Sequence, residues 1–195
     1  MIEVRIFTSY IGLEPYFQEY SVLLADYFLW NIQSRYNYKP QLFEKNAKRR
    51  NTSLDEILEE YKVMKGTKIL SERQQQRLKQ QFNAGQWMVL ICTTSKIIGM
   101  ARLYKRSETE AELHSVYVDP EFRGKKYGGV LLDRLISIAK QEGFEVIYLD
   151  TMTFMENAIK LYESRDFQQV EFLDFKEYTP ERAQEIGVIF MKLDL

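Results

Sequence analysis

Residues 112–135 read Glu-Leu-His-Ser-Val-Tyr-Val-Asp-Pro-Glu-Phe-Arg-Gly-Lys-Lys-Tyr-Gly-Gly-Val-Leu-Leu-Asp-Arg-Leu, and this stretch decides the fold. It predicts a strand, a glycine-bearing turn and the first turns of an amphipathic helix. A loop that leads into a helix N-terminus is a natural anion site, because its free N–H groups and the helix dipole both favour phosphate. Arg123, Lys125 and Lys126 add positive charge there. The stretch therefore predicts a site for a phosphate-bearing cofactor.

Further strand patterns lie on both sides of this stretch. Residues 87–93 and 96–105 are extended runs joined by a Thr-Ser-Lys turn, which predicts a hairpin. Residues 144–151 are nearly all apolar, as in a strand that is covered on both faces. A predicted helix separates this run from the strand at 112–118. We therefore expect these two strands to be parallel and joined by a right-handed crossover.

Shorter segments complete the predicted sheet. Residues 2–7 alternate like a strand, with Ile2, Val4 and Ile6 on one side. Residues 167–175 and 188–193 predict two late strands, and a helix runs through Ala158, Ile159, Leu161 and Tyr162. The predicted fold class is α/β: one domain with a mixed, mostly antiparallel sheet, a central parallel strand pair and flanking helices.

Helical patterns dominate the N-terminal part. Apolar residues between 13 and 28 follow a helical period, which predicts a long amphipathic helix. Ser53 with Glu56 and Ser71 with Gln74 are capping-box patterns that open two more helices. We expect the first of these two to be buried through four residues: Leu54, Ile57, Leu58 and Tyr61.

Composition narrows the class of protein. The 195 residues are 45% hydrophobic and 28% charged, with a net charge of −1, so no general attraction to nucleic acid or anionic lipid is expected. The single cysteine, Cys92, excludes an internal disulfide and fits a reducing compartment. No apolar run approaches the roughly 20 residues that span a bilayer. We expect a soluble, cytoplasmic protein with no membrane contact.

Three motifs resemble the GNAT superfamily of acyl-coenzyme A-dependent N-acetyltransferases. Residues 117–124, Tyr-Val-Asp-Pro-Glu-Phe-Arg-Gly, are similar to its strand and cofactor-loop signature. Residues 149–151, followed by the apolar and Leu-Tyr-Glu positions up to Phe167, resemble its next strand and helix, and residues 190–193 resemble its closing strand. The resemblance spans residues 87–195, whereas residues 30–85 lie outside it.

The resemblance implies a splayed parallel strand pair, acetyl-CoA as co-substrate and no metal. Backbone of Val116, Tyr117 and Val118 would pair with the pantetheine arm. The other implied cofactor-binding residues are Arg123, Gly124, Lys125, Lys126, Tyr127, Gly128, Gly129 and Asn157. Residues 1–85 would form a helical acceptor side, and residues 87–195 the cofactor-binding and catalytic core of a single domain at 1–195.

The implied reaction moves an acetyl group to a primary amine of a small molecule or a protein by direct attack in a ternary complex. Glu112 and His114 lie two apart on one strand and therefore on one face, where the family places its acid–base residues. The Val116 amide is the candidate oxyanion donor, and Tyr162 the candidate acid for the departing thiolate. A solvated or ion-paired Glu112, a structural His114 and a merely packed Tyr162 remain the alternatives.

Two departures from the family pattern leave open the geometry of the cofactor loop and whether the protein is catalytically active. Lys126 holds a position where the pattern has glycine, and Asp166 stands in a turn where glycine is usual. A positive φ at Lys126 would be strained, whereas a need for close approach alone would only move the loop outward. The alternative function is therefore a catalytically degenerate domain that binds acyl-CoA or a partner.

The acceptor cannot be named from the sequence, because the family selects it with segments that here match least, residues 10–85 and 175–188. An aromatic set could line the acceptor site or simply pack the helix: Tyr16, Tyr20, Tyr27, Trp30, Tyr36 and Tyr38. The role of the basic stretch at 39–50 is left open. It could be a solvated loop, or it could bind an anionic acceptor or the cofactor's 3′-phosphate; we do not expect it to bind nucleic acid. A homodimer is left open.

Overall fold

The computed structural model describes residues 2–41, 52–171 and 179–195, and most of the basic stretch at 39–50 lies outside them. One seven-stranded sheet has the order β1-β2-β3-β4-β5-β7-β6. Its strands are β1 (Glu3–Phe7), β2 (Gln86–Cys92), β3 (Ile97–Lys105), β4 (Glu110–Val118), β5 (Val146–Met152), β6 (Gln168–Val170) and β7 (Val188–Asp194). The helices are α1 (Tyr10–Leu13), η1 (Glu14–Tyr16), α2 (Phe17–Tyr38), α4 (Leu54–Thr67), α5 (Glu72–Asn83), η2 (Pro120–Phe122), α6 (Tyr127–Gln141), α7 (Glu156–Glu163) and α8 (Pro180–Ile186).

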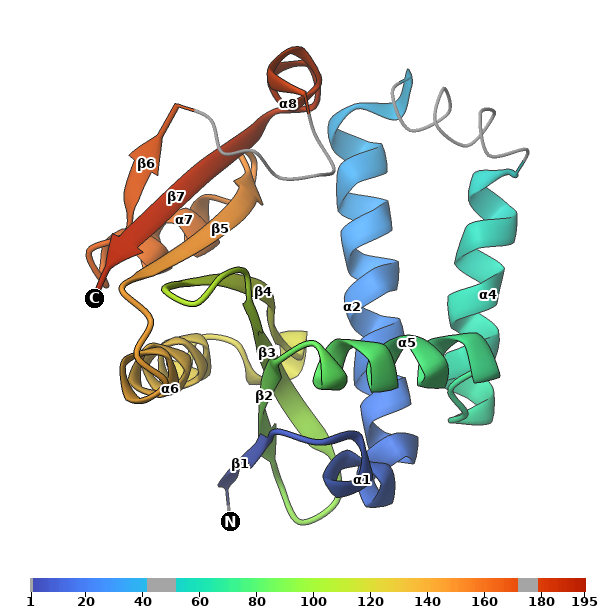
Figure 1. Ribbon diagram of the computed structural model, residues 1–195. Helices are drawn as coiled ribbons and strands as arrows, with labels where there is room; N and C mark the ends of the chain where they lie inside the picture. Colours follow the sequence, from blue (N-terminus) through green and yellow to red (C-terminus); the bar gives the residue numbers. More distant parts are fainter. Residues whose placement is uncertain (1, 42–51, 172–178) are drawn as a thin grey trace.

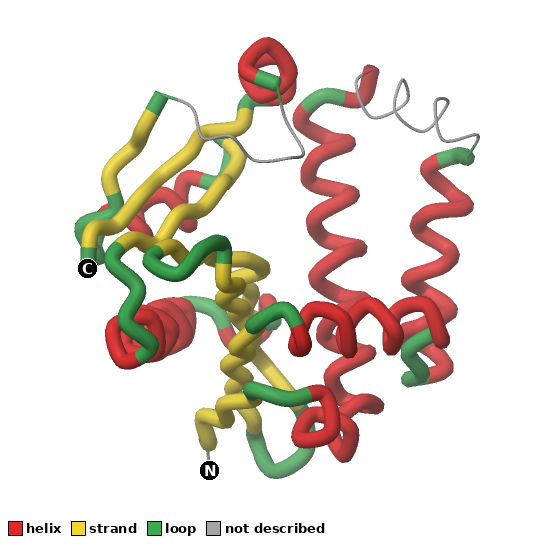
Figure 2. Tube along the Cα trace, viewed as in Figure 1, coloured by secondary structure: helices red, strands yellow, loops and turns green. Residues whose placement is uncertain are grey.

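The predicted α/β class and the central parallel pair are confirmed. β4 and β5 pair in parallel, while the other neighbouring strands are antiparallel. The parallel pairing covers only residues 110–112 of β4 and 146–148 of β5. Both strands continue beyond this point, so they separate and divide the sheet into two halves, β1–β4 and β5–β7 (Figure 2).

Helices cover both faces of the first half-sheet (Figure 1). On one face α6 buries Leu131, Leu132, Leu135 and Ile138 against β2, β3 and β4. On the other face α1, α2, α4 and α5 enclose a second apolar cluster with the alternate residues of the same strands. Each buried leucine stabilises the fold by about 1.5–3 kcal/mol. Two separate cores thus share one sheet.

The two capping boxes are confirmed, but the predicted burial of α4 is wrong. Ser53 and Glu56 bond reciprocally at the start of α4, as Ser71 and Gln74 do at α5. The residues of α4 that were expected to be buried are only half-buried: Leu54, Ile57, Leu58 and Tyr61. The buried residue of α4 is instead Met64. The reason is position, because α2 stands between α4 and the sheet (Figure 1).

Two other helical segments differ from expectation. The helix predicted across 13–28 begins as two short pieces, α1 and η1, with Pro15 in η1, and α2 then continues to Tyr38. The sequence interpretation missed α8, although its signals were present. Thr179 caps its N-terminus, and Gly187 ends it with a φ of 76°.

The edge strands complete the sheet. Ile2, Val4 and Ile6 share a side as predicted, but that side is exposed at 42%, 40% and 37%. The strand predicted near 167–175 is described as β6, and residues 172–178 lie outside the described part. Among the described residues, no helix has both the length and the apolarity needed to cross a bilayer.

Candidate active site

A β-bulge shapes β4 at the point where it leaves β5. Met100 pairs with Tyr117 and Arg102 with His114, so two residues of β4, Ser115 and Val116, stand opposite a single residue of β3. Ser115 has a φ of 54°, which places it in the left-handed region that a non-glycine residue rarely occupies. Beyond Glu112, the β4 backbone has no β5 residue to pair with. The bulge therefore lies within the gap between the two half-sheets.

Glu112 and His114 form a pair beside this bulge. His114 Nε2 lies 2.8 Å from Glu112 Oε1, and their side chains are 34% and 20% exposed. The predicted shared face is confirmed, since the intervening Leu113 belongs to the α6-side core. The His114 ring also packs edge-on against Tyr104 at 4.8 Å. The Glu112 carboxylate thus lies against the other candidate base, and the contact is an ion pair only when His114 is protonated.

This contact has a chemical consequence for the imidazole. Nε2 donates to the carboxylate, so a neutral His114 keeps its lone pair on Nδ1. A pair built this way can take a proton from a bound amine.

Tyr162 of α7 is buried at 7% exposure and packs against Phe167. Burial is the main cause that raises the pKa of the Tyr162 hydroxyl, and Tyr27 and Asp150 raise it further. The hydroxyl therefore stays protonated at neutral pH. Tyr27 of α2 and Asp150 of β5 thus lie near enough to act on Tyr162 electrostatically, while its ring belongs to the core on the α6 side of the sheet.

The loop before α6 supplies backbone N–H groups. Lys126 stands at the N-cap of α6 with a φ of 63° and makes no side-chain bond to the helix. The first turn of α6 therefore keeps N–H groups that no side-chain cap occupies. The question left open by the sequence is answered, because Lys126 is in the left-handed region. Asp166 likewise has a φ of 65° where glycine was expected.

The other predicted cofactor-binding residues of this loop and of α7 have different side-chain environments. Arg123 Nε donates to the Val118 carbonyl at 3.1 Å, and its guanidinium lies 5.2 Å from the Trp30 ring. Its charge thus turns back toward β4 and α2. At Gly128 an added Cβ would lie 3.2 Å from Leu161, so a small residue lets α6 approach α7 closely. Asn157 is exposed on α7.

Several site neighbours were missed by the sequence interpretation. Arg102 and Tyr104 of β3 lie on the face of Glu112 and His114, because the two strands pair there directly. Strand alternation on β3 could have found them once the hairpin register was known. The predicted aromatic residues of α2 have different surroundings. Tyr20 is fully buried, whereas the rings of Tyr27 and Trp30 lie against the Tyr117 ring, with centroid distances of 5.6 and 6.0 Å.

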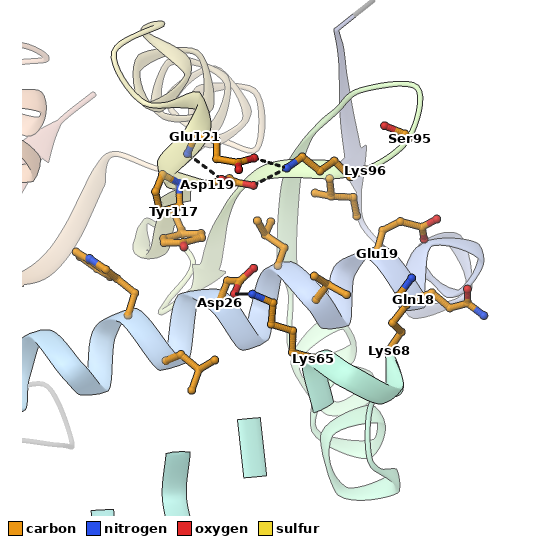
Figure 3. Close-up of a pocket in the computed structure, with 16 residues that line it drawn as sticks. Gln18, Glu19, Asp26, Lys65, Lys68, Ser95, Lys96, Tyr117, Asp119 and Glu121 are labelled. Carbon is orange, nitrogen blue, oxygen red and sulfur yellow. Dashed lines mark hydrogen bonds and ion pairs between the residues drawn. The ribbon is translucent and has the colours of Figure 1, made fainter. Parts of the chain in front are cut away.

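A separate cavity of about 660 Å³ lies at the far end of β4 (Figure 3). Residues of α2, the end of α4, the β2–β3 turn and η2 line it, and Glu112 and His114 do not. Lys65 pairs with Asp26 at 2.6 Å, while Lys96 bridges Asp119 and Glu121 at 3.0 and 3.1 Å. Its charged side chains are largely paired with one another.

Comparison with known proteins identifies the family of this chain. The model of the acetyltransferase (GNAT) family matches residues 52–167 of the 195. The chain belongs to the GNAT family. The match begins at α4, so the expectation that residues 30–85 lie wholly outside the resemblance was wrong from residue 52 onward.

Two sequence relatives of this GNAT protein that carry N-acetyltransferase names illustrate the match. It is 38% identical over 84 residues to an uncharacterized N-acetyltransferase of Dictyostelium discoideum, covering 43% of this chain and 36% of that one. It is 36% identical over 72 residues to the N-alpha-acetyltransferase RimI of Mycobacterium tuberculosis, covering 37% and 44%. The chain thus spans less than half of the length of either relative.

Solved structures show the GNAT fold over the whole chain. An acetyltransferase from Streptococcus agalactiae superimposes with a TM-score of 0.61 at 16% identity, covering 100% of this chain and 98% of that one. A PaiA N-acetyltransferase from Thermoplasma acidophilum, solved with coenzyme A, gives a TM-score of 0.59 at 19% identity and covers 100% and 99%. At this identity the likeness describes the fold alone.

Proposed function

We propose that this GNAT protein is an acetyl-CoA-dependent N-acetyltransferase that acetylates a primary amine by direct attack in a ternary complex. The observation that carries the proposal is the Glu112–His114 pair at 2.8 Å, beside the bulge where β4 leaves β5. An acid–base pair at this opening is positioned to meet an amine that approaches from the α2 face.

His114 acts as the base in this proposal. An alkylamine with a pKa near 10 is mostly charged at neutral pH, so it must lose a proton before it can attack. His114 Nδ1 takes that proton, directly or through a water, while Glu112 holds the ring through Nε2. Glu112 is a positioning residue in this scheme and stabilises the imidazolium.

Two groups handle the other charges of the reaction. The Val116 N–H donates to the oxyanion, because Val116 lies in the bulge opposite β3 and beyond the last β4 residue that pairs with β5. The Tyr162 hydroxyl gives its proton to the departing thiolate. Because burial raises the pKa of Tyr162, the hydroxyl carries a proton at neutral pH and is available as the donor.

The residues around the gap fit coenzyme A as the carrier of the acetyl group. The unpaired edge of β4 at Val116, Tyr117 and Val118 can hydrogen-bond an extended amide chain. The loop from residue 123 to residue 129 offers first-turn N–H groups of α6, with Lys125 and Lys126 exposed beside them. Bound there, the thioester supplies an activated acetyl group.

Cys92 supports direct transfer rather than an acetyl-cysteine route. It lies on β2 in the α2-side core at 6% exposure, and burial raises the pKa of its thiol. A buried thiol of this kind is a poor nucleophile.

The test is CoA release and N-acetyl product formation with acetyl-CoA and a panel of primary amines. The proposal expects at least one amine to be acetylated, and Glu112→Gln to lower kcat/KM without weakening acetyl-CoA binding. Acetyl-CoA binding with no amine acetylated would contradict it.

One observation favours a second candidate function, an acyl-CoA-binding domain without catalysis. Lys126 at a φ of 63° adds strain and side-chain bulk where α6 begins. If this distorts the loop, the protein would bind the cofactor without turning it over. A cofactor complex that leaves the whole amine panel unchanged would favour this candidate.

A further inference from the structure

Unpaired polar atoms gather beneath α2, on the β2–β3 side of the Glu112–His114 pair. The Tyr20 hydroxyl, both amide atoms of Gln86 and the Arg102 Nε are buried without a hydrogen-bond partner among the described residues. Tyr20 is 0% exposed and Gln86 is 2% exposed. Buried polar side chains are rarely left unpaired in a native protein, because each such atom is destabilising.

These three side chains lie together. Gln86 pairs across the strands with Tyr104, and the next residue on the same face of β2, Met88, pairs with Arg102. Burial raises the pKa of Tyr20 to about 12, and the nearby charge of Arg102 acts in the opposite direction. Tyr20 of α2 also shares a buried cluster with Met88 and Met100, the neighbours of Gln86 and Arg102 on the same faces of β2 and β3, so it packs over the same part of the sheet.

The cluster carries a positive charge without a negative one. Arg102 donates through Nη2 to the Ser115 hydroxyl at 2.5 Å, and its guanidinium lies 5.7 Å from the Tyr104 ring. Within residues 2–41, 52–171 and 179–195, no carboxylate lies within ion-pair distance of Arg102, and the adjacent Glu112 pairs with His114. A half-buried guanidinium without an anion is costly unless a ligand supplies one.

The cluster adjoins the catalytic pair. Arg102 and His114 are direct cross-strand partners. Side chains in that relation start about 4.5–5.5 Å apart at Cβ. The Tyr104 ring contacts both, at 4.8 Å from the His114 ring and 5.7 Å from the guanidinium. One small molecule can therefore present one group to His114 and another to Arg102.

We propose that Arg102, Gln86 and Tyr20 form an anion-binding subsite beside His114, and that the acetylated substrate is an amine that also carries a carboxylate. This inference rests on the proposed N-acetyltransferase function. The Arg102 guanidinium, the Gln86 amide N–H and the Tyr20 hydroxyl are all donors, and an ionised carboxylate is an acceptor only. Its charge also neutralises Arg102 while the amine lies at Glu112 and His114.

The main test compares free L-amino acids with their matched carboxamides as acetyl acceptors. A hydrogen bond to a charged group is worth about 1.5–3 kcal/mol, so the best free acid is expected to exceed its amide by about 10- to 100-fold in kcat/KM. In Arg102→Gln this preference falls to within about 3-fold, while acetyl-CoA binding is unchanged. The control is Arg134→Gln, an exposed arginine on α6, which keeps the preference.

Tyr20→Phe separates ligand binding from folding. Its hydroxyl has no partner among the described residues, so its removal leaves thermal stability unchanged or raised. In the same variant, the ratio of kcat/KM for the free acid to kcat/KM for its amide is expected to fall about 10-fold. Amides that serve as well as acids, or an equal loss on both in Arg102→Gln, would overturn the subsite.

A binding measurement decides the subsite even if no amine is acetylated. N-acetylamino acids and their amides are titrated into the CoA-saturated protein by calorimetry. The acids are expected to bind at least 10-fold more tightly, and only in protein with Arg102 intact. An absence of turnover would contradict the proposed function, whereas equal binding of acids and amides, or no binding of either, would contradict the subsite.

Discussion

The two faces of β3 and β4 differ in what they contain. Toward α6 these strands bury apolar residues such as Ala101, Leu103, Ala111 and Leu113, all in one core. Toward α2 they contribute Met100 and Tyr117 to a second apolar core, and the remaining positions of that face carry Arg102, Tyr104, Glu112 and His114. The difference teaches that both faces pack the sheet against helices, while the α2 face also carries the polar side chains of the candidate site. Substitutions on the two faces should therefore affect different observables.

The largest expected effect is on the α2 face. His114→Gln removes the proposed base, and general-base contributions are typically about 10²- to 10⁴-fold. We expect kcat/KM to fall within that range while the melting temperature changes little, because the side chain is 34% exposed. Steady-state kinetics and thermal melts check both parts. Unfolding in place of lost turnover would show that this face is structural as well.

On the α6 face we expect a substitution to lower stability and leave kcat/KM unchanged. Leu135 is 0% exposed in the core between α6 and the sheet. Leu135→Ala should lower the free energy of unfolding by about 2–5 kcal/mol through lost contacts and a cavity. The folded fraction should retain its kcat/KM. Denaturant titration with activity assays below the unfolding transition checks this, and Val130→Ala, at an exposed position of α6, is the matched control.

Tyr162 of α7 belongs to the α6-side core but is also the proposed acid, so its substitution sharpens the comparison. Tyr162→Phe keeps the packing against Phe167 but removes the proton donor. We expect kcat to fall on the order of 10²-fold, with the dissociation constant of acetyl-CoA nearly unchanged. Unchanged turnover under conditions where thiolate release limits the rate would assign the tyrosine to packing alone.

The smallest predicted effect concerns the loop between β4 and α6. Lys126 has a φ of 63°, and left-handed backbone costs a non-glycine residue about 1–2 kcal/mol. Lys126→Gly should therefore raise the free energy of unfolding by about 1 kcal/mol. Gly124→Ala, at a φ of 78° with open space around the added methyl, should lower it by a similar amount. Opposite shifts in a denaturant titration are the expected result.

The sequence predicts the sheet well because its signals are local. Strand alternation, the two capping boxes and the loop glycines each act over a few residues, so β2 to β5 and the starts of α4 and α5 were found. The burial of α4 was predicted wrongly, because it depends on α2 lying between α4 and the sheet, which is a tertiary fact (Figure 1). α8 was missed although its cap and its terminal glycine were readable.

The site was only half accessible to sequence reasoning. Glu112 and His114 share a strand, so their common face follows from alternation. Arg102, Gln86 and Tyr20 come from three separate elements, and only the strand register and the path of α2 bring them together. The cytoplasmic location stays a prediction and the homodimer stays open, because no structural observation bears on either.

The most direct measurement is a cycle of Glu112→Gln, His114→Gln and the double variant, with acetyl transfer and acetyl-CoA binding determined for each. If the two residues act as one acid–base unit, the double variant loses no more kcat/KM than His114→Gln alone, and all three variants bind acetyl-CoA like the parent. Additive losses, or transfer that persists in the double variant, would contradict the assignment of the chemistry to this pair.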